Sequence, residues 1–169
     1  MRVKAMVTVA MIAGLLACGK ASHVTPLRQQ KGVTLTTERP AARLPIDLAI
    51  LQNPLPILEV PVTQVINKQL TPFAIFVYLA WTESKPGSET QRKLLIGNFG
   101  VFPPDHPGRY TLRASSAFDE LRERGVNLRE SHLELLFVMR KVRETEAWTP
   151  IEVTISPVRW LPEDQPRGN

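Results

Sequence analysis

The side chains that most often carry metal or redox chemistry are few in this chain of 169 residues. Its single cysteine, Cys18, excludes an intrachain disulfide and any zinc site built on several cysteines. The three histidines, His23, His106 and His132, are too few for a multinuclear copper centre, and no two of them stand at the spacing of a ligand pair. We therefore expect no resident metal and no cofactor.

Motifs for acid–base or nucleophilic catalysis are equally scarce. The chain has no Gly-x-Ser-x-Gly, no His-Glu-x-x-His and no glycine-rich phosphate loop. Asp105 and His106 are adjacent and could form a dyad, but the prolines on both sides favour a rigid turn capped by the aspartate. A solvated helix face explains the acidic cluster of Asp119, Glu120 and Glu123, which alternates with arginines. We expect that the protein is not an enzyme and that no residue is catalytic.

Residues 1–17 have the pattern of a secretory signal peptide. A short basic segment precedes an apolar run at 5–16, which is too short to cross a bilayer as a helix. The next residues, Leu15, Leu16, Ala17 and Cys18, resemble the lipobox of bacterial lipoproteins, in which the signal is cut before the cysteine and the cysteine is lipidated. The alternative is an ordinary signal peptide that contains a cysteine.

The lipobox resemblance also implies a location. A lipidated Cys18 would hold the protein at a membrane of the cell envelope, since several acyl chains on one residue anchor more firmly than a single chain. No acidic residue directly follows Cys18, which implies sorting to the outer membrane if the cell is Gram-negative.

The basic charge of the chain does not indicate a nucleic-acid partner. The formal net charge is +5 at pH 7, but the basic residues between 122 and 143 alternate with glutamates. Alternating signs are typical of a solvated surface rather than of a phosphate-binding patch. A lipobox also places the domain outside the cytosol, so we expect no nucleic acid as partner.

The elements that must position these residues are mostly short strands. Residues 18–45 lack sustained apolar periodicity and are predicted to be a flexible tether, although Val33, Leu35 and Thr37 would allow one short strand. The folded domain is predicted at 46–161, followed by a tail at 162–169. Strands are expected at 46–51, 58–66, 73–82, 93–102, 109–113, 132–142 and 151–160.

One helix is expected among these strands, at 116–125, with Ser116 as its N-cap and Gly125 as a left-handed stop. The strand at 73–82 is apolar on both of its faces, which predicts a central strand covered on both sides. Together the short strands and frequent prolines predict an all-β fold, an antiparallel β-sandwich or Greek-key barrel with one short helix.

Residues 70–160 also resemble a known domain. The similarity lies in the strand Pro72–Tyr78, the stretch Ile96–Phe102, a short helix, the strand Leu133–Met139 and the stretch Pro150–Ile155. In this order they look like the C-terminal β-sandwich domain of plant polyphenol oxidases and many bacterial tyrosinases, which is named for a Lys-Phe-Asp-Val stretch. Here Pro72 and Ala74 replace the basic and acidic residues of that stretch. The resemblance implies an accessory domain that shields a di-copper oxidase, with a tyrosinase-like protein as partner.

Aromatic residues near the predicted loops are the candidate binding residues. Phe99, Phe102 and Tyr110 flank the Pro-rich turn that contains His106, and Trp148 lies in a later loop. Aromatic side chains in loops on a rigid scaffold are typical of protein-binding surfaces. We therefore expect these five residues to contact a protein partner.

Two other interpretations remain open. The protein could have a structural or glycan-binding role in the envelope, with Trp148 and Trp160 stacking on sugar rings. The aromatic residues could also be no more than core or loop anchors.

Overall fold

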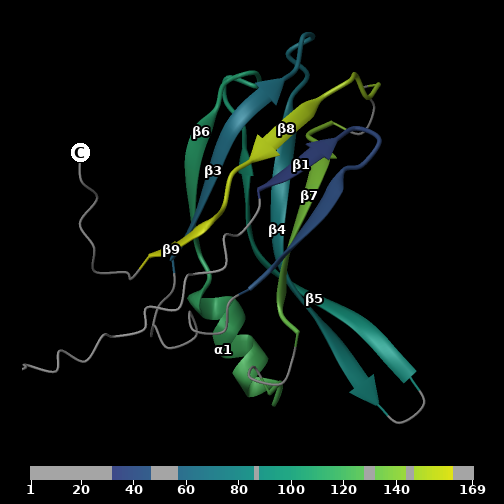
Figure 1. The fold of residues 1–169 in the computed structure, drawn as a ribbon, viewed down its shortest axis with the longest axis vertical. Coiled ribbons are helices and arrows are strands. Elements are labelled where there is room, and N and C mark those ends of the chain that lie inside the picture. The colour runs from purple at the N-terminus through teal and green to yellow at the C-terminus, as the bar shows by residue number, and fades with distance from the viewer. Residues whose placement is uncertain (1–31, 47–56, 86–87, 128–131, 144–146, 162–169) are drawn as a thin grey trace, which may run out of the picture.

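Two antiparallel sheets pack face to face, and one short helix lies at one end of them (Figure 1). The computed structural model describes residues 32–46, 57–85, 88–127, 132–143 and 147–161. The first sheet has the order β1-β8-β3-β6, with β9 also paired to β3, and the second has the order β2-β7-β4-β5. The predicted all-β sandwich with one short helix is thus confirmed.

The strands and the helix have the following bounds: β1 (Val33–Thr36), β2 (Ala41–Pro45), β3 (Ile57–Ile66), β4 (Phe73–Lys85), β5 (Ser88–Gly100), β6 (Gly108–Arg113), α1 (Ser115–Glu123), β7 (Glu134–Lys141), β8 (Glu152–Ile155) and β9 (Arg159–Leu161).

The core forms where alternate side chains of β4 and β7 point toward the first sheet. Ile75, Val77 and Leu79 of β4 are fully buried, as is Phe137 of β7, which pairs with Val77. Because neighbouring side chains of a strand point to opposite faces, an apolar residue at every second position is enough to fill this layer. The sandwich is therefore held together mainly by the inward side of its second sheet.

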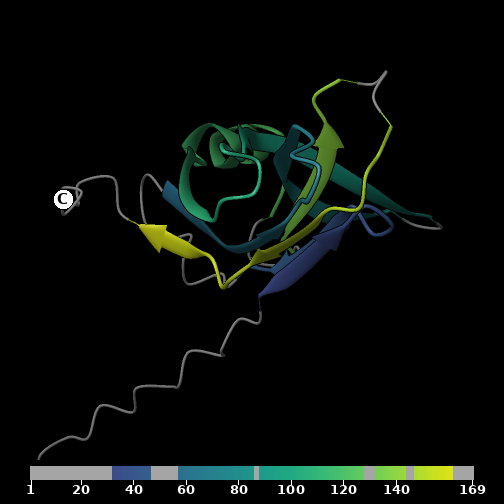
Figure 2. The ribbon, with the colours of Figure 1, turned by 90° about the horizontal axis from the view of Figure 1, so that it is seen from above.

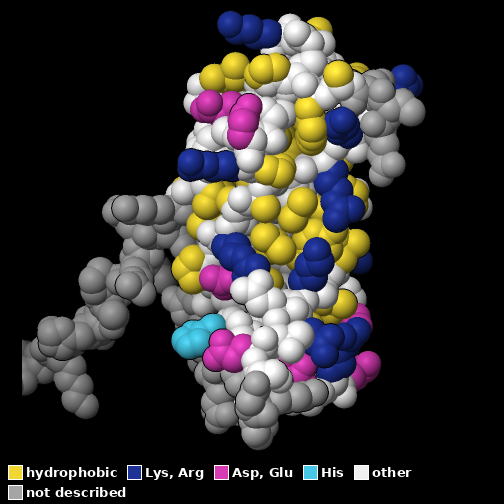
Figure 3. All heavy atoms as spheres, turned by 90° about the vertical axis from the view of Figure 1, so that its right-hand side faces the viewer, with side chains coloured by type: hydrophobic (Ala, Val, Ile, Leu, Met, Phe, Trp, Pro, Cys, Tyr) yellow, Lys and Arg dark blue, Asp and Glu magenta, His cyan; other side chains and the backbone are white. Residues whose placement is uncertain are grey.

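The outward side of β4 differs from the expectation, because no further layer of the described chain covers it. Phe76 and Tyr78 are half-buried, and their rings stack with centroids 6.5 Å apart. Arg140 lies over the Phe76 ring at 5.0 Å, and Lys93 lies over the Tyr78 ring at 4.9 Å. Long cationic side chains can cover aromatic rings while their charges stay in water. Hydrophobic and cationic side chains accordingly lie side by side on the surface in Figure 3.

The sandwich begins earlier than residue 46, within the segment predicted to be a tether. β1 pairs with β8 in the first sheet, and β2 pairs with β7 in the second. Leu35 is fully buried and Leu44 is 4 % exposed. Edge strands this short need only one or two core side chains each, so they leave little periodicity in the sequence. The signal peptide, Cys18, residues 47–51 of an expected strand and the tail at 162–169 lie outside the described residues.

The helix closes one end of the core. Phe118 and Leu121 are buried, and Trp160 of β9 packs on Phe118 with ring centroids 5.8 Å apart. Ala114, not Ser116, occupies the N-cap position. The predicted stop is confirmed: Gly125 has φ +70°, its N–H donates to Arg122 O at 2.9 Å, and Val126 N–H donates to Leu121 O at 3.0 Å. These two bonds form a Schellman motif.

The corrected start of the domain can be tested by truncating its two new core side chains. Leu35→Ala and Leu44→Ala should each lower the free energy of unfolding by about 2–4 kcal/mol, because each leaves a cavity between the sheets. Thr34→Ala, on the exposed side of β1, should change it by less than about 0.5 kcal/mol. Urea unfolding followed by tryptophan fluorescence measures the stability of all three variants. Leucine variants as stable as Thr34→Ala would contradict the assignment of residues 33–45 to the folded domain.

Candidate functional site

Three segments meet at the end of the sandwich opposite α1, at the top of Figure 1. They are the β3–β4 loop (67–72), the β5–β6 loop (101–107) and the segment before β8 (147–150), and together we call them the loop end. The loop end contains three of the predicted binding residues, Phe102, His106 and Trp148. Loops of this kind carry binding groups in many sandwich proteins, because the sheets beneath them supply rigidity.

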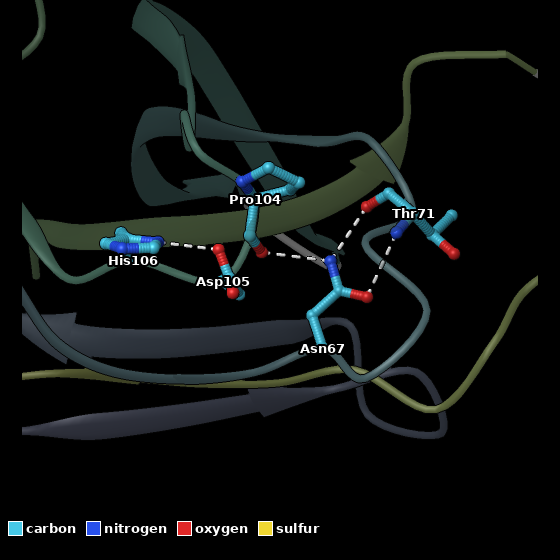
Figure 4. Close-up of polar contacts among 5 residues, drawn as sticks. All are labelled: Asn67, Thr71, Pro104, Asp105 and His106. Atoms are coloured by element: carbon cyan, nitrogen blue, oxygen red, sulfur yellow. Dashed lines mark hydrogen bonds and ion pairs between the residues drawn. The ribbon is translucent and has the colours of Figure 1, made fainter.

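Asn67 fastens two of these segments together (Figure 4). Its side chain is buried, with 3 % of the residue exposed. Its Nδ2 donates to Thr71 O and to Pro104 O, each at 2.9 Å, and its Oδ1 accepts from Thr71 N–H at 3.1 Å. The third segment is joined by a 2.6 Å hydrogen bond between the hydroxyls of Thr71 and Thr149. One buried amide thus links the β3–β4 loop to the loop that carries Phe102.

Asn67 was not among the predicted site residues. Its only sequence signal is that an asparagine follows an apolar strand and begins a turn, which is common in loops of every kind. The turn itself is closed by Leu70 N–H, which donates to Asn67 O at 3.1 Å. Leu70 has φ +53°, a conformation that bulky side chains seldom adopt. The bonds of Asn67 hold this turn in place.

Phe102 is the most exposed large hydrophobic residue of the described chain, with 89 % of its surface accessible. It stands between β5 and two consecutive prolines, Pro103 and Pro104. Proline rings fix the backbone and so reduce the number of directions in which the loop can turn. The Phe102 ring is therefore presented to solvent from a backbone whose position is restricted on both sides.

His106 also lies in this loop and is exposed. Its Nδ1 is 2.6 Å from Asp105 Oδ1, and its backbone N–H donates to Pro103 O at 3.0 Å. The predicted turn is present. The sequence pattern favoured Asp105 as a cap on this turn, whereas its carboxylate pairs with the His106 ring. No group of three or more His, Cys, Asp or Glu side chains in the described part of the chain could hold a metal ion.

Phe99 and Tyr110 lie beneath the loop rather than in it. Phe99 is on β5 and 8 % exposed, and its ring stacks on that of Tyr110 on β6, with centroids 4.1 Å apart and planes at 14°. Because β5 and β6 belong to different sheets, the stack joins the two sheets at the base of the loop. Burial raises the pKa of the Tyr110 phenol, and a backbone hydrogen bond from Phe102 opposes this shift. We therefore assign these two rings to the support of the β5–β6 loop.

Trp148 lies in the third segment of the loop end, before β8. Its ring is half-buried against the core, and Lys141 Nζ is 5.6 Å from the ring centroid. It borders an open groove of about 380 Å³ together with Pro40, Met139 and Arg140. Trp160, the other predicted sugar-stacking residue, is on β9, toward the α1 end. The two tryptophans therefore do not form one surface.

Comparisons of the sequence with protein-family models and with curated proteins gave no match. No helix within the described ranges is long and apolar enough to cross a membrane.

The role of Asn67 can be tested by removing its amide. Asn67→Ala leaves Thr71 N–H, Thr71 O and Pro104 O without their partner, which should lower the free energy of unfolding by about 2–4 kcal/mol. Asn98→Ala, an exposed asparagine on β5, is the control and should cost less than about 0.5 kcal/mol. Equal stability of the two variants in urea unfolding would show that the amide does not hold the loops together.

Proposed function

We propose that this protein is a lipid-anchored protein of the cell envelope that acts by binding another protein through its loop end, without catalysis of its own. The observation that carries the proposal is Phe102: a large aromatic side chain, 89 % exposed, on a loop fastened by a buried amide. An exposed ring contributes nothing to the core, so the fold itself gives no reason for phenylalanine at this position. A binding role does give one.

The surroundings of Phe102 suit a binding contact. Binding is weakened when a loop must first be ordered, and a loop already fixed by Asn67 and by the Phe99–Tyr110 stack avoids most of that cost. Aromatic side chains that insert into a partner's pocket supply much of the energy of many protein interfaces. We infer that Phe102 is the anchor of such an interface and that His106 lies at its polar rim.

The proposed anchor on Cys18 would keep this surface near a membrane. Fourteen residues separate Cys18 from Val33, where β1 begins. Even fully extended, they span at most about 50 Å, at roughly 3.3–3.6 Å per residue. The partner must then lie within reach of the same membrane, as a membrane protein or a protein held close to it.

The partner class that we propose to test first is a tyrosinase-like copper oxidase. The sandwich architecture is consistent with the resemblance to the domain that shields polyphenol oxidases. In this arrangement Phe102 would enter the mouth of the oxidase's site and limit access to it. Recovery of active phenol oxidase on co-expression with a tyrosinase-like protein would support this partner class.

A glycan-binding role is the second candidate, and the groove beside Trp148 is the observation that favours it. The half-buried ring borders an open groove, with Arg140 as a cationic neighbour. A sugar ring could stack on the Trp148 ring, and the acid groups of a polysaccharide could pair with Arg140. Retention on insoluble envelope polysaccharide that is lost in Trp148→Ala, and kept in Phe102→Ala, would favour this role over protein binding.

Phe102→Ala should weaken capture of the protein partner at least tenfold while leaving the fold intact, because the truncated side chain lies outside the core. The matched control is Leu95→Ala, which removes another exposed hydrophobic side chain from β5, away from the loop end. Quantitative pull-downs from detergent-solubilised envelopes compare the two variants with the unchanged chain. Equal recovery of every co-purified protein with Phe102→Ala would contradict the proposed interface.

Cys18→Ser should move the protein from the membrane fraction to the soluble envelope fraction and abolish its labelling by palmitate, since serine cannot carry the thioether-linked lipid. The control is Ser22→Ala, just beyond the lipobox, which should remain membrane-bound and labelled. A Cys18→Ser protein that still fractionates with membranes would contradict the lipid anchor but not the Phe102 interface.

A further inference from the structure

The second sheet ends in a long strand whose outer edge has no partner in the described part of the chain. β5 has 13 residues and pairs only with β4 among the described strands. The residues from Ser88 to Lys93 are all exposed. On its other side β4 pairs with β7 only as far as Ala80. Beyond that residue β4 and β5 form a two-stranded ribbon, which projects from the body of the molecule in Figures 1 and 2.

This edge lacks three features that usually prevent strands from pairing between molecules: it is not short, its regular part has no bulge, and it has no proline. The other outer strands are short: β1 has four residues, β2 has five and β6 has six, and β2 also ends in Pro45. The bulge in β5 lies at the pair Val77 and Tyr78 of β4, so it leaves the segment from Ser88 to Leu94 regular. A regular, exposed edge is a template for another strand, and a two-stranded ribbon alone is only marginally stable.

The charges of β5 itself are complementary along this edge, and Arg43 of β2 adds a guanidinium whose Nη2 donates to Gln91 Oε1 at 2.7 Å. Glu89, Gln91 and Lys93 lie on the same side of β5, two residues apart. If two β5 strands pair antiparallel with Gln91 opposite Gln91, each Glu89 stands opposite Lys93 of the other copy. Opposite charges at facing positions stabilise a pair of strands, and like charges destabilise it.

We propose that β5 pairs with β5 of a second copy about a two-fold axis at Gln91, which joins the two four-stranded sheets into one continuous sheet. Because each copy uses the same edge, the pairing is closed and does not continue into a filament. This proposal is independent of the proposed function, since it involves neither Phe102 nor Cys18.

Neighbouring registers lose the pairing of Glu89 with Lys93: centring on Thr90, for example, places Glu89 opposite Gln91. Centring the pairing on Glu89, Arg92 or Lys93 would place that charge opposite its own copy. Centring on Gln91 leaves Arg92 opposite Thr90 of the second copy, while Arg92 Nε keeps its 3.1 Å contact with Glu83 Oε2 within its own ribbon. Lys93 lies over Tyr78 on the outward side of the sheet, on the same face as the proposed charge pair.

A charge exchange tests the proposed register. Sedimentation equilibrium of the full chain in a density-matched neutral detergent should show a dimer at physiological salt. Glu89→Lys and Lys93→Glu should each raise the dissociation constant of the dimer at least tenfold, because each places like charges opposite one another. The double variant Glu89→Lys/Lys93→Glu restores opposite charges and should return the constant to within threefold of the unchanged chain.

Two controls keep this result specific. Arg109→Glu changes an exposed charge on β6, at the edge of the other sheet, and should dimerise like the unchanged chain. Phe102→Ala should do so too, which separates failure of this proposal from failure of the proposed function. A chain that is monomeric at every concentration, single variants that dimerise normally, or a double variant that does not recover would each overturn the proposal.

Discussion

The burial of one side of β4 and β7 against the first sheet is the constraint on which the rest of the structure depends. Val77 and Phe137 are fully buried partners at the centre of this layer. Leu35 and Leu44 fill it from the two N-terminal strands, which is why these strands belong to the sandwich although their sequence resembles a linker. A hydrophobic layer of this kind sets which faces are inward, but it leaves the ends of the sandwich open.

The two ends are closed by different chemistry, and this difference locates the candidate site. At one end α1 supplies Phe118 and stops at Gly125, so that end is apolar and covered. At the other end the closure is polar: Asn67 provides the hydrogen bonds that loop backbones would otherwise lose on burial. A polar closure leaves side chains such as Phe102 outside the core, where they are available for binding. The outer edge of β5 is a separate candidate interface, because it is a strand edge without a partner in the described chain and does not involve the loops.

The sequence was informative where a physical requirement repeats along the chain. The alternation in β4 and β7, and the glycine that ends α1, could be predicted because each reflects a periodic or stereochemical rule. The apolar run of β4 was misleading about its outward side, since Arg140 and Lys93 cover aromatic rings that a second layer was expected to cover. Asn67 could not be identified beforehand, because its importance depends on loops that are distant in sequence and meet only in the fold.

The central claim is that the loop end is a fixed part of the fold, and amide hydrogen exchange of the unmodified chain tests it most directly. Thr71 N–H donates to the Asn67 side chain and His106 N–H donates to Pro103 O. We predict that both amides exchange nearly as slowly as the central amides of β4, since the Asn67 side chain bonds Thr71 directly and fixes the loop of His106 through Pro104 O. Exchange of both at the rate of an unstructured peptide would contradict a preorganised surface around Phe102, even if the sandwich beneath it is stable.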